Sequence, residues 1–283
     1  MNEYRANVLI TDLDNTLFNW FDVWYRSFSV MLDIVLRKSR VDRDTLLAEM
    51  KVVHQKHGTS EYAFLLEELP SLEHLYGAEN IKTEMSDAIE AYRAARKEAL
   101  MLYPTVYDAL VTTKNTGTIL VGYTESLSFY SRYRIVNLGL DGLLDYLFSP
   151  PDHALPAGRE PDKTHRLQET RHMHTPDGEV KPNPHILMEI VDEIGEKVEN
   201  CVYVGDSLHK DMAMANSADM TTAWAKYGVA HHGREYELLR DVTHWTPAEV
   251  ELEKIFEEDD VEIVLDKNFG QILNFVQFGS MEK

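Results

Sequence analysis

The sequence has little cysteine, few positive charges and no long apolar run. Its one cysteine among 283 residues, Cys201, cannot make an internal disulfide, which fits a reducing compartment. A cysteine-based phosphatase would also need an Arg six positions after its nucleophile, and Ser207 stands there instead. The composition therefore argues against a disulfide-stabilised secreted domain and against thiol-based catalysis.

Long apolar segments are missing as well. No stretch of about 18 consecutive apolar residues occurs, so we expect no membrane span. The start of the chain, MNEYRANVLI, lacks the basic segment and the apolar core of a secretory signal. We therefore expect a cytoplasmic protein. The sequence does not indicate an oligomeric state.

Positive charge is scarce, because 48 acidic residues face 28 basic ones and the formal net charge is −20. Such a surface repels nucleic acid and anionic membranes on average, so we expect neither as a partner. It repels phosphorylated small molecules too. Any phosphate site in this chain must therefore supply its own local positive charge.

Hydrophobic patterning divides the chain into a helical part and an alternating part. Val8–Thr11 is an apolar, β-branched run that predicts a buried strand, whereas residues 19–100 show helical spacing throughout. After Pro104, predicted strands alternate with predicted helices. The strands are expected over 118–123, 202–204 and 261–265, and the main helices over 126–138, 183–194, 211–218, 235–239 and 247–256. This alternation indicates an α/β fold with a parallel sheet.

Four short polar motifs occur in a fixed order. They are Asp12-Leu13-Asp14-Asn15-Thr16, Thr124 after a predicted strand, Lys181-Pro182, and Gly205-Asp206-Ser207 with Asp211. Carboxylates that converge at the carboxyl edge of a parallel sheet suit Mg²⁺, and a hydroxyl at a helix start suits an anionic oxygen. Taken singly, the first motif is explained equally well by an acidic turn, and the others are better explained by a helix cap, a surface lysine or a capped helix start.

Together, the four motifs resemble the haloacid dehalogenase superfamily over residues 6–228. The resemblance implies a Rossmann-like parallel-sheet core made of residues 1–17 and 104–283, and an all-helical cap domain at 18–103. It also implies Mg²⁺ as the cofactor. The implied metal ligands are Asp12, Asp206, Asp211 and Asp14, the last through its backbone carbonyl.

The resemblance assigns roles to the motif residues. Asp12 would attack phosphorus and form an aspartyl-phosphate, and Asp14 would serve first as acid and then as base. Thr124 and Lys181 would hold the phosphate, since a positive charge must offset the repulsion between a carboxylate and a phosphate dianion. Further candidate substrate contacts are Thr16, Glu125 and, in the cap, Trp20 and His57.

Asp14 separates the reaction types within this family. An alkoxide leaving group needs a proton donor and a halide does not, so a carboxylate here favours phosphoryl transfer over dehalogenation. We therefore predict a phosphatase that acts on a small phosphorylated metabolite under a closing cap. Alternatives are a sugar-phosphate mutase, which shares the acid, a dehalogenase, and a non-catalytic phosphate-binding protein.

Three features depart from the family pattern. Ala218-Asp219-Met220 stands where Ala-Gly-Met is usual, and we expect the turn to survive because Asp tolerates a left-handed backbone. The segment 150–180 is rich in proline and glycine and predicts an unusually long loop. Residues 229–260 look like an addition. These two segments leave the identity of the substrate open.

Overall fold

A computed structural model describes residues 4–155, 164–176, 178–229, 233–246 and 261–279. The chain forms two compact units. The first, called here the sheet unit, comprises Met1–Asn19, Met101–Val229 and Ile255–Lys283. The second, the helical unit, comprises Trp20–Leu100 and Ala230–Lys254.

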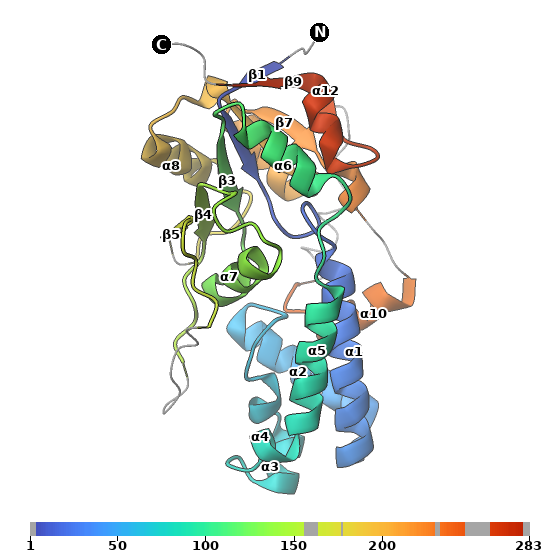
Figure 1. The fold of residues 1–283 in the computed structure, drawn as a ribbon. Coiled ribbons are helices and arrows are strands. Elements are labelled where there is room, and N and C mark those ends of the chain that lie inside the picture. The colour runs from blue at the N-terminus through green and yellow to red at the C-terminus, as the bar shows by residue number, and fades with distance from the viewer. Residues whose placement is uncertain (1–3, 156–163, 177, 230–232, 247–260, 280–283) are drawn as a thin grey trace. The chain divides into compact units, whose positions relative to one another are not determined.

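The sheet unit is built on seven parallel strands in the order β5-β4-β3-β2-β6-β7-β8. A second, two-stranded parallel sheet pairs β1 with β9 (Figure 1). The strands are β1 Tyr4–Ala6, β2 Val8–Thr11, β3 Ile119–Tyr123, β4 Tyr146–Ser149, β5 Arg171–His174, β6 Cys201–Gly205, β7 Thr221–Trp224, β8 Ile263–Val264 and β9 Val276–Phe278. The predicted α/β fold with a parallel sheet is confirmed.

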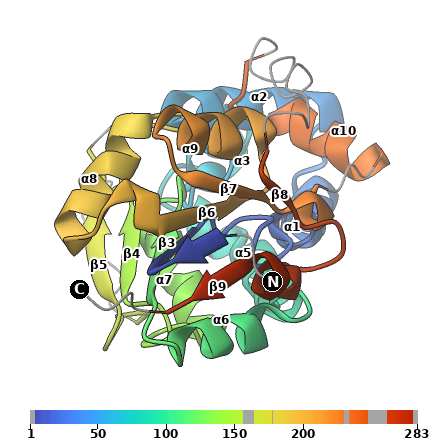
Figure 2. The same cartoon turned by 90° about the horizontal axis from the view of Figure 1, so that it is seen from above.

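Helices cover both faces of this sheet. In Figure 2, α8 and α9 lie on one face and α6 lies on the other. The helices of this unit are α6 Val106–Lys114, α7 Ser128–Asn137, α8 Pro184–Ile194, α9 Ala213–Ser217 and α12 Ile272–Phe275, with short turns η2 Val198–Asn200, η3 Leu208–Met212, η4 Lys226–Gly228 and η6 Phe269–Gln271. Every residue of β2 and β6 is buried, as expected for central strands covered on both sides.

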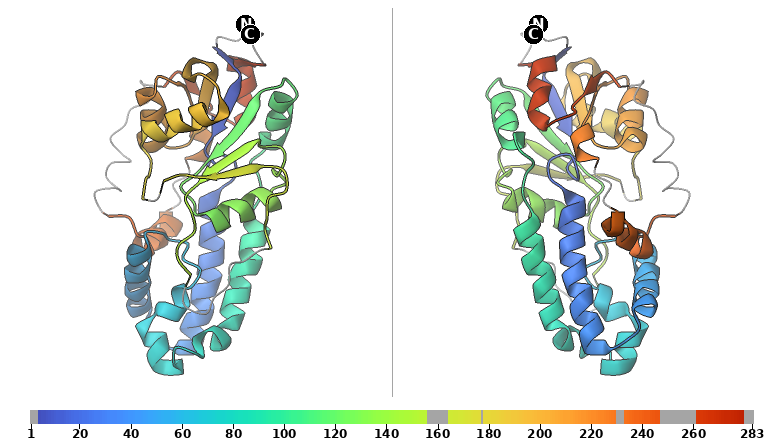
Figure 3. Two further views of the ribbon diagram at one scale, coloured as in Figure 1. Left: turned by 90° about the vertical axis from the view of Figure 1, so that its left-hand side faces the viewer. Right: turned by 90° about the vertical axis from the view of Figure 1, so that its right-hand side faces the viewer.

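The helical unit has an apolar core of its own. Its elements are α1 Trp20–Ser39, α2 Arg43–His57, η1 Leu65–Glu68, α3 Pro70–Tyr76, α4 Ile81–Glu84, α5 Ser86–Ala99 and α10 Gly233–Val242. The long helices α1 and α5 pack side by side (Figure 3). On α1, Trp24, Phe28, Leu32 and Val35 recur at helical spacing, and all four are buried.

Helix α10 packs in the helical unit, although we expected all of 104–283 to belong to the core. Leu238, Leu239 and Val242 join the apolar core of the helical unit, and the imidazole of His54 contacts the Val242 carbonyl oxygen at 2.6 Å. The physical reason is that an amphipathic helix must bury its apolar face, and α1 and α2 supply the partner surface. The predicted division of the chain into core and cap otherwise stays a prediction.

Several local predictions are confirmed. The helix predicted over 183–194 is present as α8, where the Asn183 side-chain oxygen accepts from the His185 N–H at 3.0 Å and Gly195 follows the last turn with φ 73°. Asp219 adopts the left-handed conformation, with φ 54°. The predicted helix over 247–256 lies outside the described residues. Within the described part of the chain, no helix combines the length and the apolarity needed to cross a membrane.

Candidate active site

Two of the predicted motifs lie at neighbouring strand ends. Asp12 follows β2, and its N–H donates to the Val204 carbonyl of β6 at 2.8 Å. Thr124 follows β3, and its N–H donates to the Phe148 carbonyl of β4 at 3.1 Å. Because these strands are parallel, the residues that follow them lie at the same carboxyl edge of the sheet. The motifs therefore meet where the sequence analysis expected them.

The loop after Asp12 is held against the turn η4. Asn15 has a left-handed backbone with φ 59°, which Asn tolerates better than most residues. The Tyr227 hydroxyl donates to the Thr16 carbonyl at 2.6 Å. A Cβ atom at Gly228 would lie 1.9 Å from the Asn15 carbonyl oxygen. Only glycine fits there, so η4 fixes the course of the loop that carries Asp14.

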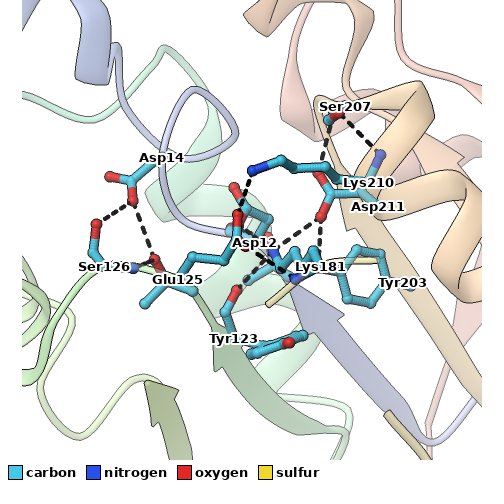
Figure 4. A network of polar contacts seen from close by, with 12 residues as sticks. Asp12, Asp14, Tyr123, Glu125, Ser126, Lys181, Tyr203, Ser207, Lys210 and Asp211 are labelled. Carbon is cyan, nitrogen blue, oxygen red and sulfur yellow. Dashed lines mark hydrogen bonds and ion pairs between the residues drawn. The ribbon is translucent and has the colours of Figure 1, made fainter. Parts of the chain in front are cut away.

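Lys181 is the cation at the centre of the site. Its Nζ donates to Asp12 Oδ1 at 2.5 Å and to Asp211 Oδ1 at 2.9 Å. The side chains of Lys181, Asp12 and Asp211 are 3%, 9% and 3% exposed, respectively. Figure 4 shows the lysine between the two carboxylates. The local positive charge that an acidic chain needs at a phosphate site is therefore present, and it is buried.

Asp211 is held from several sides. The Tyr203 hydroxyl donates to its Oδ1 at 2.9 Å, and the Ser207 N–H donates to its Oδ2 at 3.1 Å. The residue sits in the π-helical turn η3, a local geometry often found at functional sites. A Cβ atom at Gly205 would lie 2.4 Å from Asp211 Cγ. The glycine therefore gives the carboxylate room against the end of β6.

Burial and mutual repulsion dominate the electrostatics of the carboxylates. Burial raises the pKa of Asp12, the Lys181 ammonium opposes that rise, and the Asp211 and Asp14 charges add to it. Burial, followed by the Asp12 and Asp211 charges, raises the pKa of Asp206 well above its usual range. Burial alone would lower the pKa of Lys181, but Asp12 and Asp211 outweigh it and raise that pKa. The site holds more negative charge than Lys181 offsets.

A divalent cation fits this surplus of negative charge. One oxygen from each of Asp12, Asp206 and Asp211 lies within 4.8 Å of the others. Both Asp211 oxygens already accept hydrogen bonds from other residues, namely from Lys181 and Tyr203 at Oδ1 and from the Ser207 N–H at Oδ2. Carboxylate oxygens are the ligands that Mg²⁺ prefers. Asp12 and Asp206 are therefore the most available ligands, and Asp211 also holds Lys181 in place.

The Asp14 carboxylate lies apart from this cluster. Its Oδ2 accepts from Ser126 Oγ at 2.7 Å and from Thr124 Oγ1 at 3.1 Å. Its Oδ1 lies 3.0 Å from Nη1 of Arg134, a residue of α7. The side chain is thus turned toward the segment between β3 and α7 (Figure 4). The predicted metal contact through its backbone carbonyl stays a prediction.

Glu125 has structural partners for both of its carboxylate oxygens. Its Oε1 accepts from the Lys181 N–H at 2.9 Å, and its Oε2 pairs with Lys210 Nζ at 2.8 Å. These contacts connect the loop after β3 to the lysine motif and to η3. They favour a positioning role for Glu125 over the direct substrate contact that we predicted. That contact stays untested.

The remaining candidate substrate contacts fall in different places. Thr16 is fully buried, and within the described residues its hydroxyl has no hydrogen-bond partner. Trp20 and His57 belong to the helical unit, where the Trp20 indole donates to Glu61 at 3.1 Å and His57 stacks on Tyr62 at 3.6 Å. Their contact with substrate stays a prediction.

Sequence reasoning missed several residues that complete the site. They are Ser126 and Arg134 beside Asp14, Lys210 beside Glu125, and Tyr203 beside Asp211. Tyr203 could have been found from the sequence, because a tyrosine inside the apolar run of β6 must find a hydrogen-bond partner for its hydroxyl. The others look like ordinary polar residues of a loop or a helix surface.

Comparisons with known proteins agree with this picture. A family model described as HAD-hydrolase-like matches residues 180–250. Glyceraldehyde 3-phosphate phosphatase of Methanopyrus kandleri is 28% identical over 152 residues, which span 54% of this chain and 55% of that relative. The match thus covers about half the length of the curated relative.

Solved structures share the fold at low identity. The 2-haloacid dehalogenase from Pseudomonas syringae pv. tomato DC3000 superposes with a TM-score of 0.56 at 15% identity, covering 95% of this chain and 97% of that one. A haloacid dehalogenase-like family hydrolase from Xanthomonas campestris gives a TM-score of 0.51 at 14% identity, covering 89% and 93%. The matched family model and the curated relative thus agree with the resemblance to the haloacid dehalogenase superfamily that the ordered motifs carry.

Proposed function

We propose that this protein is a Mg²⁺-dependent phosphomonoester hydrolase that works through an aspartyl-phosphate. One observation carries the proposal. The buried Asp12 carboxylate lies against the Lys181 ammonium, and a carboxylate oxygen of Asp206 lies within 4.8 Å of an Asp12 oxygen. A fixed ammonium, together with a cation bound between Asp12 and Asp206, would offset the charge of the Asp12 carboxylate and allow it to attack an anion.

The first step transfers the phosphoryl group to Asp12. A carboxylate oxygen of Asp12 bonds to phosphorus while the bond from phosphorus to the leaving oxygen breaks, and Asp14 gives that oxygen a proton. Lys181 offsets negative charge next to the attacking oxygen. Bound Mg²⁺, held by Asp12 and Asp206, would neutralise charge on the phosphoryl oxygens.

The second step releases the phosphate. A water molecule attacks the phosphorus of the aspartyl-phosphate, and Asp14, now a carboxylate, accepts the proton. The bond between phosphorus and Asp12 breaks, so inorganic phosphate leaves and the Asp12 carboxylate is restored. Asp14 thus acts once as acid and once as base, and the proton balance closes over the two steps.

A small phosphorylated metabolite is the substrate class that we propose. The curated relative carries the name glyceraldehyde 3-phosphate phosphatase, which supports a substrate of this size. The net charge of −20 disfavours nucleic acid as a partner. The one thiol, Cys201, is buried and unpaired, which supports a reducing, cytoplasmic setting.

Phosphate release tests the proposal. With Mg²⁺, the purified protein should free inorganic phosphate from small phosphomonoesters, including glyceraldehyde 3-phosphate; chelation should stop the reaction and added Mg²⁺ should restore it. Rapid quenching of Asp14→Asn with an aryl phosphate should show an intact mass higher by one phosphoryl group, and Asp12→Asn should show none. Activity in metal-free buffer would contradict the proposal. Isomerisation without phosphate release would indicate a mutase, and halide release from 2-chloropropionate a dehalogenase.

A further inference from the structure

A buried arginine contacts the Asp14 carboxylate. Arg134 comes from α7, and its side chain is 3% exposed. Its Nη1 lies 3.0 Å from Asp14 Oδ1 and donates to Asp14 Oδ2 at 3.3 Å. An arginine is almost never fully buried unless it is paired, because removing its charge from water is costly. The position of Arg134 therefore needs an explanation, and Asp14 is its carboxylate partner here.

Ser126 extends the contact between these two residues. Arg134 Nη1 donates to Ser126 Oγ at 2.5 Å, and Ser126 Oγ in turn donates to Asp14 Oδ2 at 2.7 Å. Thr124 Oγ1 donates to the same Asp14 oxygen at 3.1 Å. The carboxylate is thus held by a guanidinium and two hydroxyls, all from the segment that follows β3. This arrangement fixes both where Asp14 lies and how its side chain is turned.

Aromatic rings keep the guanidinium itself in place. Its central carbon lies 5.4 Å from the centroid of Phe18 and 5.8 Å from that of Tyr130. Both rings are buried, at 0% and 6% exposure. Cation–π contacts of this kind favour one position of a planar guanidinium over others. Arg134 is therefore a rigid support rather than a mobile counter-ion.

The orientation of Asp14 matches the needs of an in-line reaction. In phosphoryl transfer, the leaving oxygen lies on the far side of phosphorus from the attacking oxygen. The acid that protonates it must therefore stand apart from the nucleophile. Figure 4 shows Asp14 apart from Asp12 and its cluster, with the side chain turned toward Ser126. The contacts that hold it there bear directly on how well a proton reaches the leaving oxygen.

We propose that Arg134 is a positioning residue for the acid–base step, acting through Asp14 and assisted by Ser126. The proposal rests on the phosphatase function proposed above. Arg134 does not touch the reacting atoms in this scheme. It holds the Asp14 carboxylate in the orientation from which it serves the leaving oxygen, so in the phosphoryl-transfer step its loss should matter mainly when the leaving group needs a proton.

The test compares leaving groups within one enzyme sample. 4-Nitrophenyl phosphate has a leaving group that needs little protonation, whereas glycerol phosphate has an alkoxide that needs a donor. Arg134→Ala should lower kcat/KM, which reports the phosphoryl-transfer step and not the later hydrolysis, by about 10- to 100-fold for glycerol phosphate and by less than about 3-fold for 4-nitrophenyl phosphate. Because both rates come from one sample, their ratio does not depend on the fraction of protein that is folded.

Two further variants supply the rescue and the control. Arg134→Lys retains a cation at the site. It should therefore restore part of the activity on glycerol phosphate relative to the activity on 4-nitrophenyl phosphate. Arg132 lies on the same helix, is more exposed, and pairs with Asp152 at 3.4 Å and with the Ser128 hydroxyl at 2.8 Å. Arg132→Ala removes the same charge from α7 and should leave the ratio at its wild-type value.

A double mutant separates positioning through Asp14 from any other effect. In an Asp14→Asn background, Arg134→Ala should change the ratio no further, because the group it positions is already gone. Equal losses on both substrates, an unchanged ratio in Arg134→Ala, or a further change in the Asp14→Asn background would each overturn the inference alone. A wild-type enzyme that releases phosphate from neither substrate would overturn the proposed function, and this inference with it.

Discussion

The two units of this protein bury different kinds of side chain. The sheet unit buries ionisable groups, among them Asp12, Lys181, Asp211 and Arg134, beside an apolar core of its own. The helical unit buries mainly aliphatic and aromatic groups, such as the stacked pair Trp24 and Phe28, whose ring centroids are 4.8 Å apart. The sheet unit therefore combines buried charges with apolar packing, whereas the core of the helical unit is mainly apolar.

This difference separates function from stability. Burying charges is costly even when they are paired, and such pairs contribute little net stability compared with apolar residues of the same size. Burying apolar area stabilises without needing a partner of fixed geometry. We therefore expect changes to the buried charges of the sheet unit to affect chemistry more than folding, and changes to the apolar core of the helical unit to do the reverse.

The largest expected effect is the loss of the nucleophile. Asp12→Asn should lower kcat by about 10³-fold or more, because an amide oxygen is a poor nucleophile at a site built for a carboxylate. The thermal midpoint should stay the same or rise, since the amide removes a charge that repels Asp206 and Asp211. Asp22→Asn, which breaks the exposed pair with Arg26 at 2.9 Å, is the control and should leave kcat unchanged. Wild-type turnover in Asp12→Asn would refute the covalent mechanism.

A smaller but still large effect should follow from Gly205→Ala. The new Cβ would overlap Asp211 Cγ, so the carboxylate and the turn η3 must shift away from Lys181. Overpacking of this kind costs about 1–3 kcal/mol of stability, and we expect kcat to fall about 100-fold as Lys181 loses a partner.

Gly195→Ala is the matched control for that variant. Its φ of 73° also disfavours a side chain, but a Cβ there meets nothing within 4 Å. It should therefore destabilise the fold by about 1 kcal/mol and leave kcat of the folded enzyme unchanged. Equal activity losses in the two variants would show that Gly205 matters only through stability.

Much of the sheet unit was predictable from sequence because its signals are local. A buried β-branched run, a helix cap such as Asn183 or a left-handed Asp219 is specified by a few neighbouring residues. The motif residues were predictable for a related reason, since residues that follow parallel strands must share one edge of the sheet. The approach of Lys181 to Asp12, 169 positions apart in sequence, follows from that topology.

What escaped prediction depends on tertiary pairing. Arg134 is one of two arginines on α7, and the local sequence does not say which of them is buried against Asp14 and which stays near solvent. The amphipathic pattern of α10 indicates that one face is buried but not against which unit. In both cases the deciding contact comes from a segment far away in the sequence, so no local pattern reports it.

The packing of α10 gives the third prediction. Leu239 is 1% exposed in the apolar core of the helical unit, so Leu239→Ala should cost about 2–4 kcal/mol through lost burial and a residual cavity. Hydrogen exchange should show the loss in α1, α2 and α10, with little change in β2 and β6. Leu75→Ala, at a side chain 48% exposed, is the control. Faster exchange in the strands alone would show that α10 stabilises the sheet unit instead.

The smallest effect concerns the one buried imidazole in the apolar core described for the helical unit. His54 is 1% exposed, its Nδ1 donates to the Val242 carbonyl, and its Nε2 has no partner among the described residues. Burial lowers the pKa of His54 from 6.5 to about 4, and the charges of His244 and His57 act in the same direction, whereas the hydrogen bond to Val242 opposes them. Protonation would place a second N–H where no acceptor is available, so the folded helical unit keeps His54 neutral.

Acid should therefore weaken the helical unit over a defined range of pH. Between pH 6.5 and about 4 the unfolded chain binds a proton at His54 and the folded chain does not, so stability falls as pH falls, by at most about 3 kcal/mol. His54→Asn keeps a donor near the Nδ1 position and cannot ionise. Its stability at neutral pH should be lower because the side chain is smaller, but the decline in hydrogen-exchange protection of α2 over this range should shrink. His74→Asn, at an exposed site on α3, should keep the wild-type slope. An unchanged slope in His54→Asn would mean that another group sets the acid response. The neutral state of His54 would then no longer distinguish the apolar core of the helical unit from the buried charges of the sheet unit.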